Sequence, residues 1–371
     1  MARKKSRKKL SAGSVVFAFI FFVIAVIGYY VYKNYFQKQE TPPPVVIDGE
    51  LSFHFLQLGN DHSGDCIYVK AGDNDILIDA GSKTNSVTTI RNYLNTYCTD
   101  NILEYVIATH GHSDHISGFA GTTSENTSIF DYYECKVIID FPKTENINDT
   151  YGRYVNKRDA EVSAGAKHYT ALECYLESVE GAKKSYTLGE GISLNILYNY
   201  YYENDASKEN NYSVCVMFTH GDRNFLFTGD LELSGEEKLV ELNQLPEVEL
   251  YKAGHHGSYT SSNDLLLSRI KPKIVAITCV AAEPSYGDSY GFPHQQVIDN
   301  ISKYTDKVYV TSTCVPDYTN GADVVGLNGD IVVTSGESGV TVDCSVSDLP
   351  LKDSKFMKDG YRLMPVLWQS A

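Results

Sequence analysis

Four potential metal ligands lie within six consecutive positions, and this cluster constrains the fold more than any other feature of the chain. Residues 109–115 read THGHSDH and follow the apolar run 105–108, which predicts a buried strand. His110 and His112 point the same way if the chain stays extended, so both can hold one ion. Asp114 and His115, beyond a turn, can face a second ion. Imidazole and carboxylate together suit zinc or manganese and have no evident role in an apolar core.

Two later strand ends could complete such a site. Residues 226–230 read LFTGD, and the carboxylate of Asp230 could bridge two ions, although Gly-Asp after a strand is usually only a turn. Residues 252–258 read KAGHHGS, so a predicted strand ends in two histidines between glycines. All three motifs stand at the carboxyl end of a predicted strand, which is how one cleft gathers ligands from distant parts of a chain. We therefore expect one site built from three segments.

Beyond residue 48 the chain alternates short apolar runs with amphipathic stretches, which is typical of a mixed α/β fold. Strands are expected at 51–58, 66–69, 76–79, 105–109, 136–140, 192–197, 214–219, 224–228, 249–252, 274–279, 308–311, 331–334 and 340–344. Helices are expected at 86–97, 235–243, 263–270 and 294–303. The stretch 155–180 is expected to be mostly helical and is the least decipherable region. Two similar halves of this kind predict two sheets packed together with helices outside.

The N-terminal segment predicts a membrane anchor. Residues 10–32 contain no charged side chain, and this segment is long enough for a helix to span a bilayer. Tyrosines stand at its far end, where an aromatic belt is expected. Six positive residues precede this segment and two follow soon after, so the N-terminus should stay in the cytoplasm. A cleaved signal peptide is the alternative, but no small-x-small cleavage site follows. We expect a basic cytoplasmic segment (1–13), a single membrane helix (14–32) and a tether (33–48), with the catalytic domain outside the cell.

The rest of the chain is acidic. Residues 41–371 hold 24 basic and 46 acidic residues, a formal charge of −22. Affinity for phosphate backbones comes mainly from Lys and Arg, so this balance disfavours a large nucleic-acid footprint. A solvated acidic surface is the simplest interpretation, and it favours a small or local substrate over long DNA.

The motifs, in their order along the chain, resemble those of the metallo-β-lactamase superfamily. The matching stretches are LIDAG at 77–81, the cluster at 110–115, TGD at 228–230 and GHHGS at 254–258. Within the superfamily, the hydrolase domain of ComEC-type competence proteins is similar also at Gly64-Asp65, at 211–214 and at 290–294. The ComEC membrane channel segments are absent. The resemblance implies a four-layer αββα sandwich over residues 49–345, followed by a C-terminal tail (346–371).

The resemblance also implies a role for each matching residue. His110 and His112 would hold the first ion, Asp114 and His115 the second, with Asp230 as the bridge and His255 completing the second. Asp114 and Asp79 are the expected catalytic residues, Asp79 by orienting a ligand histidine. The histidine that usually completes the first ion is missing, and Asn211 and Ser213 stand there instead. Candidate substrate contacts are Asn211, Lys252, His256, Ser258 and His294, for which packing or turn roles are equally open.

The implied activity is hydrolysis with two divalent ions, zinc or manganese, and a metal-bound hydroxide. The missing histidine disfavours a β-lactam substrate. A phosphodiesterase or nuclease of the ComEC type is the first expectation. A cell-surface phosphorylcholine esterase is the second, because teichoic-acid phosphorylcholine esterases share the His-Ser-Asp-His loop and a segment similar to 198–204. A surface binding protein that has kept the fold without turnover is the third. The expected partners are a phosphoester, as DNA or a choline-phosphate-bearing polymer, and the membrane, with no obligate protein partner.

Overall fold

The computed structural model describes residue 25 and residues 49–369, apart from 125, 283–290 and 316–323. Except for residue 25, the expected cytoplasmic segment, membrane helix and tether therefore lie outside the described residues. Within the described part of the chain, no helix has both the length and the apolar character needed to cross a bilayer. Residues 47–371 form one compact unit, which contains all the expected site residues.

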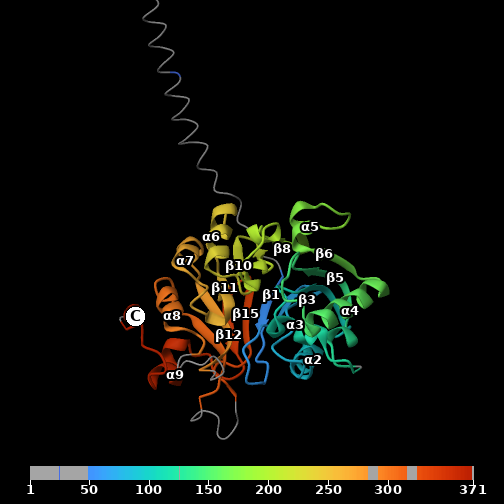
Figure 1. The fold of residues 1–371 in the computed structure, drawn as a ribbon. Coiled ribbons are helices and arrows are strands. Elements are labelled where there is room, and N and C mark those ends of the chain that lie inside the picture. Colours follow the sequence, from blue (N-terminus) through green and yellow to red (C-terminus); the bar gives the residue numbers. More distant parts are fainter. Residues whose placement is uncertain (1–24, 26–48, 125, 283–290, 316–323, 370–371) are drawn as a thin grey trace, which may run out of the picture. The chain divides into compact units, whose positions relative to one another are not determined.

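Two large sheets dominate this unit (Figure 1). Among the described residues, the first sheet has eight strands in the order β16 (Gly339–Cys344), β15 (Ile331–Gly336), β1 (Leu51–Phe55), β2 (Ile67–Ala71), β3 (Asn74–Ile78), β4 (Ile102–Ile107), β5 (Glu134–Asp140) and β6 (Lys167–Thr170). The second sheet, counted in the same way, has the order β14 (Val325–Gly326), β13 (Val308–Thr313), β12 (Ile274–Ala281), β11 (Leu250–Lys252), β10 (Arg223–Phe227), β9 (Val216–His220), β8 (Ile192–Ile196) and β7 (Ser185–Gly189). The expectation of a mixed α/β chain with two large sheets is confirmed.

Helices lie on the outer sides of the two sheets, an arrangement consistent with the expected sandwich (Figure 1). The helices beside the first sheet are α2 (Ser86–Tyr97), α3 (Ser113–Ala120), α4 (Asp149–Ala164) and α5 (Ala171–Leu176). Those beside the second sheet are α6 (Leu233–Leu242), α7 (Asp264–Ile270), α8 (Gln295–Ile301) and α9 (Lys355–Lys358). The stretch expected as a C-terminal tail packs here as far as it is described, because Leu351, Phe356 and Trp368 are buried in the same core as α7 and α8.

Aromatic side chains join the two sheets. Phe53 of β1 packs against three rings of the second sheet, with centroid distances of 5.3 Å to Phe218, 4.8 Å to Phe225 and 5.2 Å to Phe227. All four side chains are buried. Buried aromatic pairs of this kind contribute beyond their apolar area, so this contact fixes the sheets face to face.

The region 155–180, expected to be mostly helical, holds most of α4, the short strand β6 and the helix α5. The helix α4 begins earlier, where the Asn148 side chain accepts a hydrogen bond from the Tyr151 amide, and it ends at Gly165, whose φ is 125°. The next residues form β6, which pairs in parallel with β5. The mostly helical character is confirmed, but the strand between the two helices was not predicted. Tyr154 is the only buried residue of α4, so no apolar stripe marks where that helix begins and ends.

Candidate metal centre

Strand ends from both sheets converge at the site. In the first sheet β3 and β4 run parallel, so the residues after them, Asp79 and 109–115, lie at one edge. In the second sheet β10 and β11 run parallel, which brings Asp230 and residues 253–258 together. The two edges meet where His115 Nε2 lies 3.1 Å from Asp230 Oδ2. The expectation that one site collects ligands from three segments agrees with this geometry.

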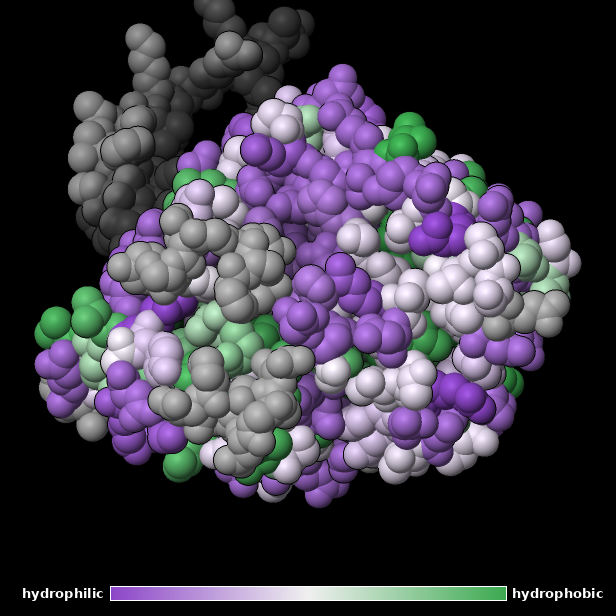
Figure 2. Space-filling view, turned by 60° about the horizontal axis from the view of Figure 1, so that its bottom comes forward, coloured by the Kyte–Doolittle hydropathy of each residue, from purple (hydrophilic) through white to green (hydrophobic). Residues whose placement is uncertain are grey.

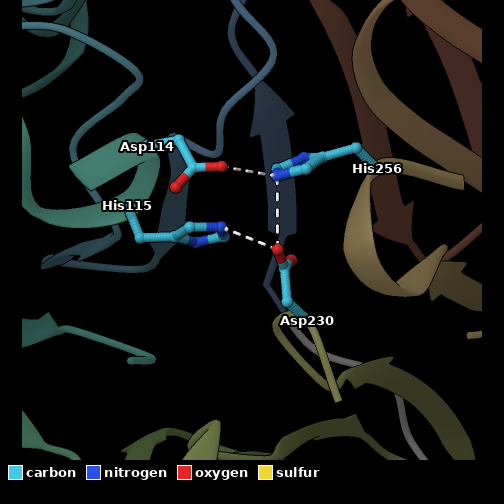
Figure 3. A group of neighbouring side chains, drawn as sticks. All are labelled: Asp114, His115, Asp230 and His256. Carbon is cyan, nitrogen blue, oxygen red and sulfur yellow. Dashed lines mark hydrogen bonds and ion pairs between the residues drawn. The ribbon is translucent and has the colours of Figure 1, made fainter. Parts of the chain in front are cut away.

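Four side chains form the centre of the site (Figure 3). Asp114, His115, Asp230 and His256 each offer one ligand atom, and these atoms all lie within 4.8 Å of one another. His256 Nε2 lies 3.4 Å from Asp114 Oδ2 and 3.3 Å from Asp230 Oδ2. Asp230 Oδ1 and His256 Nε2 are buried and make no hydrogen bond to the described residues. Two imidazoles and two carboxylates with orphaned buried atoms fit a divalent cation such as zinc or manganese.

The local backbone brings Asp114 and His115 to this centre. They occupy the first turn of α3, whose N-cap is His112. The helix lies unusually close to the segment after β3, because the Gly118 amide donates to the Ala80 carbonyl at 3.0 Å. A Cβ at Gly118 would stand 2.1 Å from that carbonyl oxygen, so only glycine allows this approach.

Asp79 orients His115, as expected from the resemblance. Its Oδ1 accepts from the Thr109 amide at 2.8 Å, and its Oδ2 lies 2.7 Å from His115 Nδ1. Asp79 has no exposed surface, so it acts on the site only through its neighbours. Burial raises the pKa of the Asp79 carboxyl, an effect that His115 opposes. Burial lowers the pKa of His115, but Asp230 and Asp79 outweigh it and hold that pKa well above its usual value.

The two histidines of η6 (Gly254–Gly257) exchange the positions that the resemblance implied. His256, expected as a substrate contact, belongs to the central group of four. His255, expected as a ligand, has its Nε2 4.0 Å from Asp230 Oδ2, and its Nδ1 is 2.8 Å from the Thr260 hydroxyl. Burial lowers the pKa of His255 to about 4. Both residues have positive φ, 47° and 55°, so the turn directs the second ring inward, which spacing alone does not reveal.

His110 and His112 form a separate pair. His110 Nε2 lies 3.0 Å from His112 Nδ1, a distance at which both could hold one ion. Burial lowers the pKa of His110 well below its usual value. Neither histidine belongs to a cluster of three or more ligands among the described residues. The position that the resemblance assigns to a first ion therefore has fewer potential ligands in reach than the group of four.

Asn211 and Ser213, which stand where a third histidine is usual, are occupied with backbone contacts. The Asn211 side chain accepts from the Glu232 amide at 3.1 Å and donates to the Ser234 hydroxyl at 3.2 Å. The Ser213 hydroxyl accepts from the Asp230 amide at 3.1 Å. Asn211 is also almost wholly buried, so the expectation that it contacts substrate is not supported by its position.

Lys252, another expected substrate contact, is 1% exposed and points into the protein. Its Nζ lies 2.5 Å from Asp65 Oδ2 and 3.7 Å from Asp230 Oδ1. Burial lowers the pKa of Lys252, but the two carboxylates outweigh it and raise that pKa. A lysine that ends a strand is usually solvated, and this one is buried because Asp65 compensates its charge.

Asp65 is the residue of the site that the sequence interpretation missed. It is buried, accepts from the Thr278 hydroxyl, and has its Oδ1 3.2 Å from His256 Nδ1. It therefore stands to His256 as Asp79 stands to His115. Burial raises its pKa, but Lys252 and His256 outweigh this and hold the pKa well below its usual value. The only signal in the sequence was the Gly64-Asp65 pair noted with the ComEC likeness.

The remaining expected substrate contacts lie beside the centre. Ser258 is buried, and its hydroxyl accepts from the Thr260 amide and hydroxyl, which is a turn role. His294 is partly exposed, packs its ring 5.0 Å from Tyr259 and accepts from the Tyr259 amide through Nδ1. Of the two, only His294 has a side chain open to solvent near the site.

Comparisons with known proteins support the expected family. Residues 60–289, more than half of the chain, match the family described as anti-Pycsar protein Apyc1. Recombination protein 2 of Haemophilus influenzae is 29% identical over 104 residues, or 28% of this chain and 12% of that protein. ComE operon protein 3 of Bacillus subtilis is 27% identical over 107 residues, or 29% and 13%. The matches thus span a small part of each curated relative.

Solved structures are also similar. The metallo-β-lactamase fold protein YhfI of Bacillus subtilis has a TM-score of 0.41 at 12% identity, over 71% of this chain and 96% of that one. A diphosphatase of the PhnP family has a TM-score of 0.33 at 12% identity, over 62% and 86%. The expected resemblance to ComEC-like proteins is confirmed by the two curated relatives.

Proposed function

Because this chain belongs to the anti-Pycsar protein Apyc1 family, and because its buried centre suits divalent cations, we propose that it is a metal-dependent phosphodiesterase. One observation carries the proposal, the convergence of Asp114, His115, Asp230 and His256 with two orphaned buried atoms among them. Such a ligand set has no purpose in a core unless a cation compensates it. The coarser statement, a metal-dependent hydrolase, also agrees with the fold and the ComEC-like relatives.

The side chains around the centre prepare it for hydrolysis. Bound ions would lower the pKa of a coordinated water and stabilise negative charge that develops on the substrate. Asp79 faces Nδ1 of His115, and Asp65 and the Thr278 carbonyl face Nδ1 of His256, so each ring presents Nε2 to the centre. Asp114 is the most exposed of the four, with 26% of its side chain open, so substrate and water approach from its side.

The proposed substrate class rests on two features, the missing third histidine of the site and the hydrophilic, acidic character of the surface. Neither Asn211 nor Ser213 is placed as a third nitrogen ligand, which disfavours the β-lactam chemistry of members that carry three histidines. Most of the surface coloured in Figure 2 is hydrophilic, with hydrophobic residues in small separate groups. Together with the acidic balance of the sequence, this favours a small soluble phosphodiester over a long polyanion. Because one relative is named recombination protein 2, DNA is the polymer to test. The name of the family, anti-Pycsar protein, suggests in addition that the activity is directed against Pycsar.

The setting of this activity is also a proposal. Residues 14–32 would form a single membrane helix, with the N-terminus in the cytoplasm and the catalytic unit outside the cell. The support is the uncharged segment 10–32 and the six positive residues before it. Protease protection of the C-terminal unit in intact cells and in inverted vesicles would test this orientation.

The deciding experiment combines metal analysis with three substrates. The full chain is purified, its zinc and manganese content is measured, and it is assayed on bis-p-nitrophenyl phosphate, p-nitrophenyl phosphorylcholine and single-stranded DNA. We expect the first substrate to be hydrolysed, and Asp114→Ala to abolish the rate. Preference for the choline ester would favour the surface esterase, and preference for DNA the nuclease. If the metal-loaded protein turned over none of the substrates, the hydrolase proposal would fail, and a binding protein with the same fold would be the remaining hypothesis.

A further inference from the structure

The backbone of Gly111, between His110 and His112, is held by side chains from two other segments. The Gly111 amide donates to Glu209 Oε1 at 3.1 Å, and Asn146 Nδ2 donates to the Gly111 carbonyl at 2.5 Å. Glu209 begins η5 (Glu209–Tyr212), and Asn146 follows β5. Both backbone polar groups of Gly111 therefore have side-chain partners from distant parts of the chain.

The carboxylate of Glu209 accepts three hydrogen bonds. Besides the Gly111 amide, Oε1 accepts from the Thr144 hydroxyl at 2.6 Å, and Oε2 accepts from the Glu145 amide at 2.8 Å. The Asn146 amide in turn donates to the Thr144 hydroxyl at 3.0 Å. Three donors on one partly buried carboxylate hold it in a single orientation, since charge-assisted hydrogen bonds are the stronger ones.

The space around Gly111 is correspondingly tight. A Cβ at this position would lie 2.6 Å from Thr144 Oγ1 and 2.7 Å from Glu209 Oε1. A side chain at this position would displace the Thr144 and Glu209 groups that reach the backbone. A tolerance of about half an ångström decides whether two imidazoles can share an ion.

We propose that Glu209 is a positioning residue for the first metal position. By fixing the Gly111 peptide it holds the nitrogens of His110 and His112 at their 3.0 Å separation. It stands in the same 3-10 turn as Asn211, so the segment that usually supplies a third histidine here supplies a backbone support instead. The inference rests on the proposed two-ion hydrolase. It identifies Glu209 as the residue on which the geometry of the first position depends.

A substitution to glutamine removes this support without changing the side-chain volume. Oε1 faces the Gly111 amide and Oε2 faces the Glu145 amide, so either orientation of the new amide group places an NH₂ against a backbone N–H. The matched control is Asp205→Asn. Asp205 is exposed and pairs with Lys143 at 2.7 Å, which ties the same two segments together without touching Gly111.

The experiment measures metal binding by the full chain. Metal-free wild type, Glu209→Gln and Asp205→Asn are titrated with cobalt(II) and zinc against a competing chelator, and the cobalt absorption spectrum and the melting temperature of the metal-free protein are recorded. We expect Glu209→Gln to weaken the ion at the first position, the looser of the two, by about 10- to 100-fold, with the tighter ion at the second position unchanged. Asp205→Asn should change neither constant.

Several results would overturn the inference. They are a wild type that takes up a single ion, a Glu209→Gln protein with both affinities intact, and an equal loss in Asp205→Asn. If Glu209→Gln fails to fold, Asn146→Ala removes the other hydrogen bond of Gly111 and should show the same selective loss. Because metal binding is measured without turnover, failure of the phosphodiesterase proposal would appear separately, as bound ions with no hydrolysis.

Discussion

The two metal positions of this site are supported in different ways. The second, at Asp114, His115, Asp230 and His256, is held by side chains, with Asp79 behind one histidine and Asp65 and Lys252 behind the other. The first, at His110 and His112, is held by its backbone through Gly111, and among the described residues no group of three or more ligands includes it. The resemblance gives it only a share in Asp230. Charge and rigidity both favour the second position, so we expect it to bind its ion more tightly.

The largest effect should come from the residue that the two positions share. Asp230→Asn should release both ions and lower kcat/KM by more than the roughly 100-fold limit typical of outer partners, because it removes a ligand rather than a support. Metal content after gel filtration and the rate on bis-p-nitrophenyl phosphate measure this loss. If Asp230→Asn kept one tightly bound ion, Asp230 would be a ligand of one position only, and the two positions would not share a carboxylate.

The next effect separates the two adjacent histidines. His256→Ala should weaken the tighter ion by more than about 100-fold, whereas His255→Ala should change it by less than about tenfold, because His255 Nε2 is 4.0 Å from Asp230 Oδ2 and lies outside the group of four. Isothermal titration of the metal-free proteins gives both constants. The reverse order of effects would restore His255 as the ligand.

A smaller effect should follow from the buried ion pair behind His256. Lys252→Met leaves Asp65 without its counter-charge, so unfolding should become easier by about 3–5 kcal/mol, and the tighter ion should bind about 10- to 100-fold more weakly. Urea unfolding of the metal-free protein and chelator competition measure these changes. The double variant Asp65→Asn with Lys252→Met is the control and should recover part of the stability. Tighter metal binding in Lys252→Met would mean that the lysine acts by repulsion rather than by positioning.

The smallest effect concerns stability in the presence of metal. An ion at about 100 times its dissociation constant should stabilise the folded protein by about 2.7 kcal/mol, which appears as a rise in melting temperature that a chelator reverses. In wild type the rise should continue at higher metal concentration as the looser position fills. His110→Ala should lose only that second stage. A variant without either stage would show that the two positions fill as one.

The sequence predicted the parts of the molecule that depend on local patterns. The helix at 86–97 was confirmed, and the strands that deliver Asp79, His110 and Asp230 lie close to where apolar runs placed them. Asp65 and Glu209 were not identified as site residues, because their partners are distant in the sequence and no spacing rule connects them. Lys252 was misread because burial of a charge depends on a partner from the other sheet. Of the His255-His256 pair, the ring of His256 points inward because both residues have positive φ. The sequence of two histidines between glycines does not predict these φ values.

The order of strands in the first sheet has a consequence for how the protein is made. β1 is hydrogen-bonded to β2 on one side and to β15 on the other, with Leu51 opposite Ser335. A ribosome delivers β15 only after both metal-binding edges have been synthesised, so the sheet that carries His110 to His115 stays incomplete until then. Completion of the first sheet by β15 and β16 is therefore a late event in the synthesis of the chain.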